Sequence, residues 1–181
     1  MAQNIEIKAR LTQEQFDLID EKGRELTESW PEVLRQKDTF FESKSGRLKL
    51  REFFDQDGNP TSIAELIHYH RPDQDGPKLS KYSRIEIEQA SELREALAGA
   101  NGVISVVEKC RQLYLLEQTR VHLDDVKSLG LFLELEVVLE QGQTTDDGTQ
   151  IARHWMEEFG VTDEMLVDRA YIDLLPEPLG R

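Results

Sequence analysis

Residues 120–138 read RVHLDDVKSLGLFLELEVV, and the alternation in this stretch decides the predicted fold. From residue 131 to 137 the odd positions are leucine or valine, whereas Glu134 and Glu136 take even positions. From residue 120 to 124 two apolar residues alternate with an arginine, a histidine and an aspartate. Neighbouring side chains on a strand point to opposite faces. The stretch therefore predicts two strands, joined by a turn at 128–130, that each carry an apolar face and a charged face.

The same alternation recurs along much of the chain. It is found at residues 4–10, 47–51, 84–88 and 106–111, and the polar positions are mostly Arg, Lys and Glu. A solvated face of an ordinary sheet would also alternate. A closed antiparallel barrel with a charged lumen accounts better for the repetition, and closure removes exposed strand edges. We therefore predict an α+β fold in which helices cover the apolar outer face of the barrel.

The remaining elements follow from turn and cap signals. We expect strands at 3–10, 35–42, 47–54, 63–71, 82–88 and 103–107, a strand pair at 109–118, and a strand at 120–125. We expect a helix capped by Thr12 with Gln15, with Leu26 on its apolar stripe, and a short helix at 91–100. A third helix begins at an Asp146 or Asp147 cap and runs through Phe159, and a last helix covers 162–175. Residues 72–81 are expected to form a polar loop.

Composition indicates one soluble domain and excludes some partners. A chain of 181 residues is long enough to bury a core, and 38% hydrophobic with 32% charged residues is typical of a globular protein. The net charge of −14 argues against nucleic acid or an anionic membrane as the main partner. The basic residues therefore matter through their positions, as a local positive site within an acidic protein.

The expected location is the cytoplasm. Cys110 is the one cysteine, so no intramolecular disulfide can form, which fits a reducing compartment. The first ten residues lack an apolar core of signal-peptide length, and no run of about 18 apolar residues occurs. The odd parity of Lys109 and Arg111 puts Cys110 on the outer face, where we expect it to pack rather than react.

A lumen of this composition suits a phosphate-rich ligand and a divalent metal. Arg forks match phosphate oxygens, and Lys supplies compact charge. Carboxylates such as Glu6, Glu134 and Glu136, with Asp124 nearby, are hard oxygen ligands of the kind that magnesium or manganese prefers. Metal-assisted phosphoryl or nucleotidyl transfer is the resulting hypothesis.

The ordered motifs resemble the CYTH superfamily, also called triphosphate tunnel enzymes. They are NIEIK (4–8), GRLKLRE (46–52), RIEIE (84–88), EKCRQLY (108–114) and the block at 120–136, so they span nearly the whole chain. The tail DRAYIDLL (168–175) resembles the class IV adenylate cyclase branch, to which thiamine triphosphatases are related. The resemblance implies an eight-stranded antiparallel barrel that forms a tunnel, as a single CYTH domain over residues 1–181.

The resemblance also implies roles for residues that match the family motifs. The triphosphate would be bound by Lys8, Lys49, Arg51, Arg71, Arg84, Lys109, Arg111 and Arg120. The metal, Mg²⁺ or Mn²⁺, would be held by Glu6, Glu134 and Glu136, with Asp124 or Glu86 assisting or positioning water. Glu6, Lys8 and Glu136 would be the catalytic residues. The sequence departs from the family at Asn4, where the first glutamate of the motif is expected, which puts a second metal site in doubt.

Three functions stay open on this basis. The first is an enzyme that transfers a phosphoryl group from a nucleoside, organic or inorganic triphosphate to water. The second is a class IV adenylate cyclase that converts ATP to cyclic AMP and pyrophosphate. The third, which Asn4 keeps open, is a module that binds a nucleotide or polyphosphate without turnover. We expect a small-molecule triphosphate as the partner, and a homodimer stays open.

Four further residues, three histidines and one tryptophan, can be explained without a role in the site. His68 and His70 share a strand face at metal-ligand spacing, but without a third ligand we interpret them as ordinary strand residues. His122 lies on the charged face, where it could carry a proton or make a structural hydrogen bond. Trp155 is expected to pack in the core under the last helices.

Overall fold

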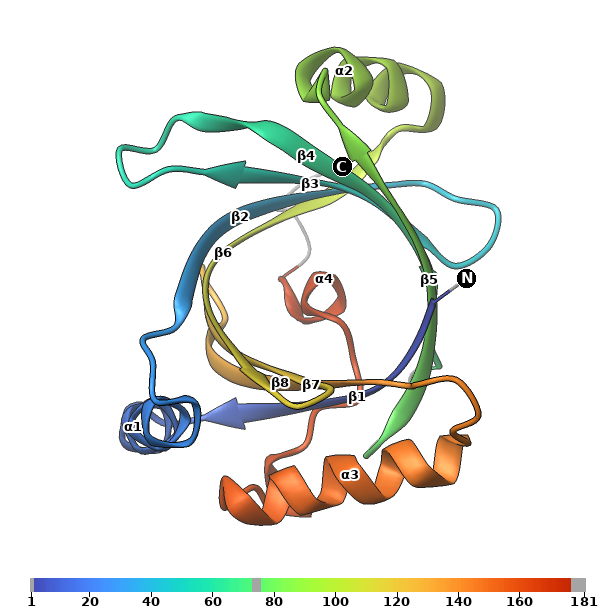
Figure 1. Ribbon diagram of the computed structural model, residues 1–181. Helices are drawn as coiled ribbons and strands as arrows, with labels where there is room; N and C mark the ends of the chain where they lie inside the picture. The colour runs from blue at the N-terminus through green and yellow to red at the C-terminus, as the bar shows by residue number, and fades with distance from the viewer. Residues whose placement is uncertain (1, 73–75, 177–181) are drawn as a thin grey trace.

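Eight antiparallel strands close into a barrel in the computed structural model, which describes residues 2–72 and 76–176 (Figure 1). The strands are β1 (Ala2–Leu11), β2 (Glu32–Phe41), β3 (Arg47–Phe54), β4 (Pro60–His70), β5 (Lys78–Ile87), β6 (Val103–Leu116), β7 (Thr119–Val126) and β8 (Gly130–Val138). Their order around the barrel is β1-β5-β4-β3-β2-β6-β7-β8, and β8 pairs with β1 to close it. The predicted α+β fold with a closed eight-stranded antiparallel barrel is therefore confirmed.

Helices cover the outer wall on two sides (Figure 1). The helical segments are α1 (Gln13–Thr27), α2 (Ala90–Asn101), α3 (Thr145–Glu158), the 3-10 turn η1 (Asp163–Met165) and α4 (Tyr171–Leu174). Helix α1 packs mainly against β6 and β8, and α3 packs against β1 and β8, whereas α2 lies over β2 and β3. None of the helices in the described part of the chain is long and apolar enough to cross a membrane.

The alternation of side chains divides the wall into an outer apolar face and a charged lumen. On β1 and β8, Ile5, Ile7 and Leu135 are buried in the main outer core beneath α1 and α3. Glu6 and Lys8 lie between them on the opposite face and line the lumen. Burial of the apolar face under the helices fixes the register of these strands, since a shift by one residue would exchange the two faces.

Two predicted boundaries in the sheet are wrong. The strand at 103–107 and the strand pair at 109–118 are one continuous strand, β6, which pairs with β2 along most of its length. The expected loop at 72–81 is shorter, because β5 begins at Lys78, directly opposite Glu6 of β1. Residues 73–75 of that loop lie outside the described residues. In both places pairing with a neighbouring strand overrides the local polar composition.

The first and third helices follow their cap signals closely. Thr12 and Gln15 form the predicted capping box at the start of α1. The helix continues past Gly23, whose missing side chain lets α1 approach the ring of Tyr114. The predicted placement of Leu26 on the apolar stripe is wrong, because Leu26 is 43% exposed. The N-cap of α3 is Thr144 rather than Asp146 or Asp147, since Asp147 instead completes the capping box from inside the helix.

The predicted last helix at 162–175 is wrong in a way that matters for the site. Only η1 and the single turn α4 are helical, and the chain between them is extended. There Leu166 bridges Ala9, and the backbone N–H of Val167 donates to the carbonyl of Lys8 at 2.9 Å. These contacts direct the chain across one mouth of the barrel, so that α4 (red) lies over the lumen in Figure 1.

Tyr171, at the start of α4, anchors this segment in the end of the barrel. It packs in an apolar cluster with Phe40, Val107 and Phe132, and its ring contacts that of Phe132 edge-on. The cluster fills this end of the lumen with apolar side chains. The lumen is therefore covered at one end by the chain's own C-terminal segment.

The contact at Gly23 gives a first test of the packing. A Cβ at residue 23 would lie 2.9 Å from the Tyr114 ring, so Gly23→Ala is expected to destabilise by about 1–3 kcal/mol through overpacking. The matched control is Gly99→Ala in α2, where a Cβ meets nothing within 4 Å; it should stabilise by about 0.5–1 kcal/mol. Urea unfolding of both variants measures the difference. Equal stabilisation by both would show that Tyr114 does not limit the approach of α1.

Candidate functional site

The basic residues that the sequence singles out line one cavity inside the barrel. Seven of them lie on five strands, and Arg71 directly follows β4; they are Lys8, Lys49, Arg51, Arg71, Arg84, Lys109, Arg111 and Arg120. Because they converge on a narrow lumen of about 130 Å³, they form a local positive site in a protein of strongly negative net charge. The structure thus brings together every residue that was expected to bind the triphosphate.

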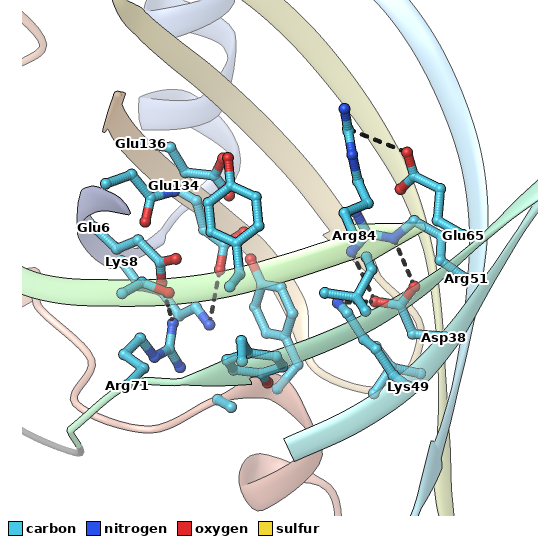
Figure 2. A pocket seen from close by; sticks show the side chains of 18 of the residues that line it. Glu6, Lys8, Asp38, Lys49, Arg51, Glu65, Arg71, Arg84, Glu134 and Glu136 are labelled. Atoms are coloured by element: carbon cyan, nitrogen blue, oxygen red, sulfur yellow. Dashed lines mark hydrogen bonds and ion pairs between the residues drawn. The ribbon is translucent and has the colours of Figure 1, made fainter. Parts of the chain in front are cut away.

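Three carboxylates gather on the β1–β8 side of this cavity. Glu6 lies opposite Glu136 in the register of the two strands, and Lys8 lies opposite Glu134. Figure 2 shows the three glutamates near one another, with Lys8 and Arg71 among them. Their spacing follows directly from the two-residue period of the strands. Glu6, Glu134 and Glu136, the main predicted metal ligands, are therefore together in space.

Each of these carboxylates has a cation beside it. Arg71 donates to Glu6 at 2.8 Å, and the Lys8 ammonium lies 2.9 Å from Glu134. Arg120 contacts Glu136 at 3.4 Å. Burial raises the pKa of Glu6, against the opposing effect of Arg71, and Glu136 and Glu134 raise it further. Burial likewise lowers the pKa of Lys8, although Glu134 opposes this.

A second cluster, centred on Asp38, occupies the opposite side of the lumen (Figure 2). The Asp38 carboxylate accepts from Lys49 at 2.7 Å and from Arg51 at 2.7 and 2.9 Å, and Lys109 lies 3.6 Å away. Burial alone would raise the pKa of Asp38, but Arg51, Lys49 and Lys109 hold it well below its usual value. Burial, with Arg111, lowers the pKa of Lys109 to about 7.

Asp38 lines the lumen, although the sequence pattern did not predict this position for it. It lies directly opposite Arg51 in the β2–β3 register, and this register places it in the lumen. Around it the sequence reads QKDTFFE, where polar and apolar residues do not alternate cleanly. The parity of this strand could have been inferred only by pairing it with residues 47–54, whose alternation is clear.

Asp124 is held by other protein groups, and Arg111 links it to Glu134. It is fully buried and accepts two hydrogen bonds from Arg111, each at 2.6 Å, and one from the Tyr171 hydroxyl at 2.9 Å. Arg111 also reaches Glu134 at 2.5 Å. In this arrangement Asp124 fixes the orientation of Arg111 and of the segment that covers the lumen.

Tyr171 is the second residue that the sequence reading did not assign to the site. Besides its bond to Asp124, its ring lies under the Lys8 ammonium, 3.7 Å from nitrogen to ring centre. The motif DRAYIDLL contains it, but nothing in the local pattern indicates that the tail returns to the barrel mouth.

Glu86, the other predicted assisting carboxylate, lies outside this group. It is exposed near the end of β5, opposite Glu65 of β4. Arg84, two residues before it, is half exposed and pairs with Glu65 at 3.1 Å, so this part of β5 forms the rim of the cavity. Beyond the rim a wider hollow of about 530 Å³ opens, where Phe53, Ile63 and Leu113 add apolar surface.

Several residues of the described wall have a buried side-chain atom without a hydrogen-bond partner, among them Asn4 and His122, which line the cavities. Asn4, which stands where the family motif has its first glutamate, is buried and lines the lumen, and its Oδ1 has no partner. His122 is 3% exposed, and its Nδ1 also has no partner. Burial, with Arg111, lowers the pKa of His122 well below its usual value, so the imidazole is neutral.

The remaining interpreted residues lie away from the lumen. The His68 Nε2 donates to the carbonyl of Ser45 at 2.9 Å, and its ring lies beside that of His70, as in ordinary strand residues. Trp155 is buried in the outer core, as predicted. Cys110 is partly buried and alternates with Lys109 and Arg111, which face the lumen.

Comparison with known proteins agrees with this architecture. A protein of Methanocaldococcus jannaschii named "Putative adenylate cyclase" is 24% identical over 106 residues, which cover 55% of this chain and 61% of the relative. The matched region thus spans less than two thirds of that relative's length.

Solved structures share the fold at low sequence identity. A Pyrococcus horikoshii protein superposes with a TM-score of 0.76 at 21% identity, over 96% of this chain and 99% of the other. A Hippeastrum protein, described as a "putative adenylyl cyclase" with a dominant triphosphatase activity, has a TM-score of 0.61 at 14% identity, over 94% of this chain and 91% of the other.

The family model described as the CYTH domain matches residues 2–171, which includes all eight strands and the start of the segment that covers the lumen. The resemblance seen in the ordered motifs is thereby confirmed, and the chain belongs to the CYTH family.

Proposed function

We propose that the protein cleaves a triphosphate by metal-dependent phosphoryl transfer to water. The observation that carries the proposal is the convergence, in one lumen, of a ring of basic side chains and three neighbouring carboxylates. Burying so many charges is costly unless a ligand matches them. The relatives named as adenylate cyclases and the Hippeastrum protein described with triphosphatase activity support a triphosphate as that ligand.

The basic residues would bind and orient the phosphate chain. Arg51 and Arg111 are already aligned by bidentate bonds to Asp38 and Asp124, so their guanidinium planes are fixed before a ligand enters. Fixed forks match the spacing of phosphate oxygens and lose little freedom on binding. Lys8 and Lys109 would add compact charge on opposite sides of the lumen.

The carboxylates fit a divalent metal. Glu6, Glu134 and Glu136 supply hard oxygen donors, and the crowding that raises the pKa of Glu6 would be relieved by a cation among them. Bound Mg²⁺ or Mn²⁺ would neutralise charge on the phosphate oxygens. Asn4 supplies a neutral carbonyl oxygen in place of a fourth carboxylate, so the negative charge here is smaller than in the family motif.

In the reaction a water oxygen bonds to the terminal phosphorus as the bond from phosphorus to the bridging oxygen breaks. The leaving phosphate chain takes the bridging oxygen with its electron pair, and the proton lost by the water passes to phosphate or solvent. Lys8 on β1 and Glu136 on the neighbouring strand β8 both line the cavity, where they would contact the reacting groups. Positioning and charge stabilisation supply most of the acceleration in such reactions.

A cyclase is the second candidate, because the lumen continues into the wider hollow. Phe53, Ile63 and Leu113 line this hollow and could receive a nucleoside, whose 3′-hydroxyl would replace water as the nucleophile. Pyrophosphate and cyclic AMP would then be the products. An inorganic triphosphate needs only the lumen.

A product assay decides between these activities. Metal-free protein supplied with Mg²⁺ or Mn²⁺ is incubated separately with ATP, thiamine triphosphate and tripolyphosphate, and phosphate, pyrophosphate and cyclic AMP are resolved. We expect phosphate release by the wild type. The rate should fall at least about 100-fold in a Glu134→Gln, Glu136→Gln double variant, because each substitution removes a charged metal ligand. Cyclic AMP with pyrophosphate would instead identify a cyclase. If the protein binds a triphosphate but forms no product that is lost in the double variant, both enzyme activities are rejected in favour of a binding module.

Asp38 is expected to stabilise the ligand-free protein because its charge neutralises the cations around it. Asp38→Asn leaves three cations facing one another and should destabilise the ligand-free protein by about 3 kcal/mol. Tripolyphosphate should raise the melting temperature of the variant more than that of the wild type, because the added anion replaces the lost carboxylate. Thermal unfolding with and without tripolyphosphate measures this, with Asp125→Asn on the exposed face of β7 as control. An equal shift in both proteins would contradict the role given to Asp38.

Lys109 makes binding dependent on pH. Its pKa is about 7 in the ligand-free protein, so the amine is largely neutral at pH 8. A bound triphosphate raises this pKa, and therefore binding at pH 8 takes up a proton and weakens as pH rises above 7. Calorimetric titration in two buffers of different ionisation enthalpy measures the uptake. The uptake should be smaller in Lys109→Arg, which stays charged; the same uptake in both proteins would assign the proton to another group.

A further inference from the structure

We infer that His122 is a nitrogen ligand in a metal site shared with Glu134 and Glu136, and that this site selects a divalent first-row transition ion over Mg²⁺. The inference rests on the proposed function, since it concerns the metal of the same lumen. It goes further by giving the site a ligand and a metal class that the carboxylates alone do not specify.

The strand register brings the three side chains together. His122 of β7 lies directly opposite Glu134 of β8, and Glu136 follows two residues later on the same face. One potential ligand atom from each residue lies within 4.8 Å of the other two. The His122 Nδ1 is 3.7 Å from a Glu136 oxygen and 4.0 Å from a Glu134 oxygen. A small closure of the carboxylates would place all three atoms around one ion.

The Nδ1 atom is the observation that points to a ligand. It is buried and has no hydrogen-bond partner, although it lies between two carboxylates. Both separations exceed the roughly 2.7–3.2 Å of a hydrogen bond to nitrogen. His122 Nδ1 is one of several buried atoms of the described residues without a partner, and it faces two carboxylate oxygens, so a group that binds all three atoms would satisfy it.

The cations around the glutamates leave room for this ion. Lys8 and Arg111 contact Glu134, and Arg120 contacts Glu136 at 3.4 Å. Arg111 contacts the Glu134 oxygen that lies nearest to His122, and a carboxylate oxygen has two lone-pair sites, so this oxygen can bind a metal beside Arg111. Glu136 has one long contact from Arg120, and its other oxygen is the one nearest to His122.

The site is reachable from solvent and adjoins the phosphate-binding lumen. His122 and Glu136 both line the wider hollow, whereas Glu134 and Glu136 line the narrow lumen. An ion on these three residues would therefore lie where the hollow meets the lumen. There it could contact a ligand that occupies either space.

The imidazole sets the class of metal. Mg²⁺ prefers oxygen donors and keeps most of its water, whereas imidazole nitrogen suits zinc, iron, nickel and copper best. Mn²⁺ also favours oxygen donors, but it gives up its water more easily than Mg²⁺ and accepts an imidazole beside carboxylates. Three carboxylates without a histidine would leave Mg²⁺ and Mn²⁺ nearly equivalent. A mixed set of one nitrogen and two carboxylates favours the transition ion.

Metal binding to the full-length protein, without any triphosphate, tests the inference. Metal-free protein is titrated with Mn²⁺ and with Mg²⁺ by calorimetry, and with Co²⁺ by visible absorption. His122→Asn is expected to lower Mn²⁺ affinity about tenfold or more, to leave Mg²⁺ affinity unchanged and to alter the Co²⁺ spectrum. The matched control is His154→Asn on α3, which should change none of these. Unchanged Mn²⁺ affinity in His122→Asn, or an equal loss for both metals, would overturn the inference.

A measurement on the wild type covers the case in which His122→Asn does not fold. Pulsed electron paramagnetic resonance of the Mn²⁺-loaded protein detects a directly bound nitrogen through its coupling to the ion. We expect the coupling of one imidazole nitrogen, and its absence would reject His122 as a ligand. Because no substrate is present, these results stand apart from the product assay, so either proposal can fail while the other holds.

Discussion

The pairing of buried charges inside a closed wall is the constraint on which the rest of this structure depends. A lumen lined by arginine, lysine and carboxylates can exist only if each carboxylate is neutralised by groups within reach. Asp38 meets this condition with Lys49 and Arg51, and Asp124 meets it with Arg111 and the Tyr171 hydroxyl. The outer face requires nothing of the kind, because apolar residues and helices cover it. The inner face of the barrel is therefore stabilised by charge pairing, and the outer face by burial of apolar side chains.

The same pairing prepares the lumen for an anion. In the ligand-free protein Asp38 occupies a place among cations much as a phosphate oxygen would. The cations are therefore already oriented, and a ligand exchanges one set of negative partners for another instead of ordering free side chains. The opposite wall of the lumen, formed by β1 and β8, carries three glutamates and is therefore more negative than the wall around Asp38. A chain of phosphates with a bound cation matches both walls at once.

The sequence was sufficient for the barrel and for most of the site because alternation assigns each side chain to a face without knowledge of its neighbours. This is why Lys8, Arg51 and Glu136 were placed in the lumen. It was insufficient where the answer depended on register or on distant contacts. Asp38 lies in a strand without clear alternation, and only its pairing with Arg51 shows that it faces inward. The sequence at 162–175 has a helical pattern, but Leu166 and Val167 bond to the backbone of β1 in an extended conformation. This path also brings Tyr171 to the lumen. The roles given to the site residues stay predictions.

The segment that covers one mouth of the barrel affects how a ligand enters and leaves the lumen. Tyr171 and its apolar neighbours make the lumen a blind passage as long as α4 stays in place. Among the described residues, the lumen opens toward the wider hollow, so a ligand that enters from that side would leave the same way. Two fragments made from one molecule would therefore depart in a fixed sequence, the outer one first. Slow escape of that outer fragment would then limit turnover however fast the bond is broken.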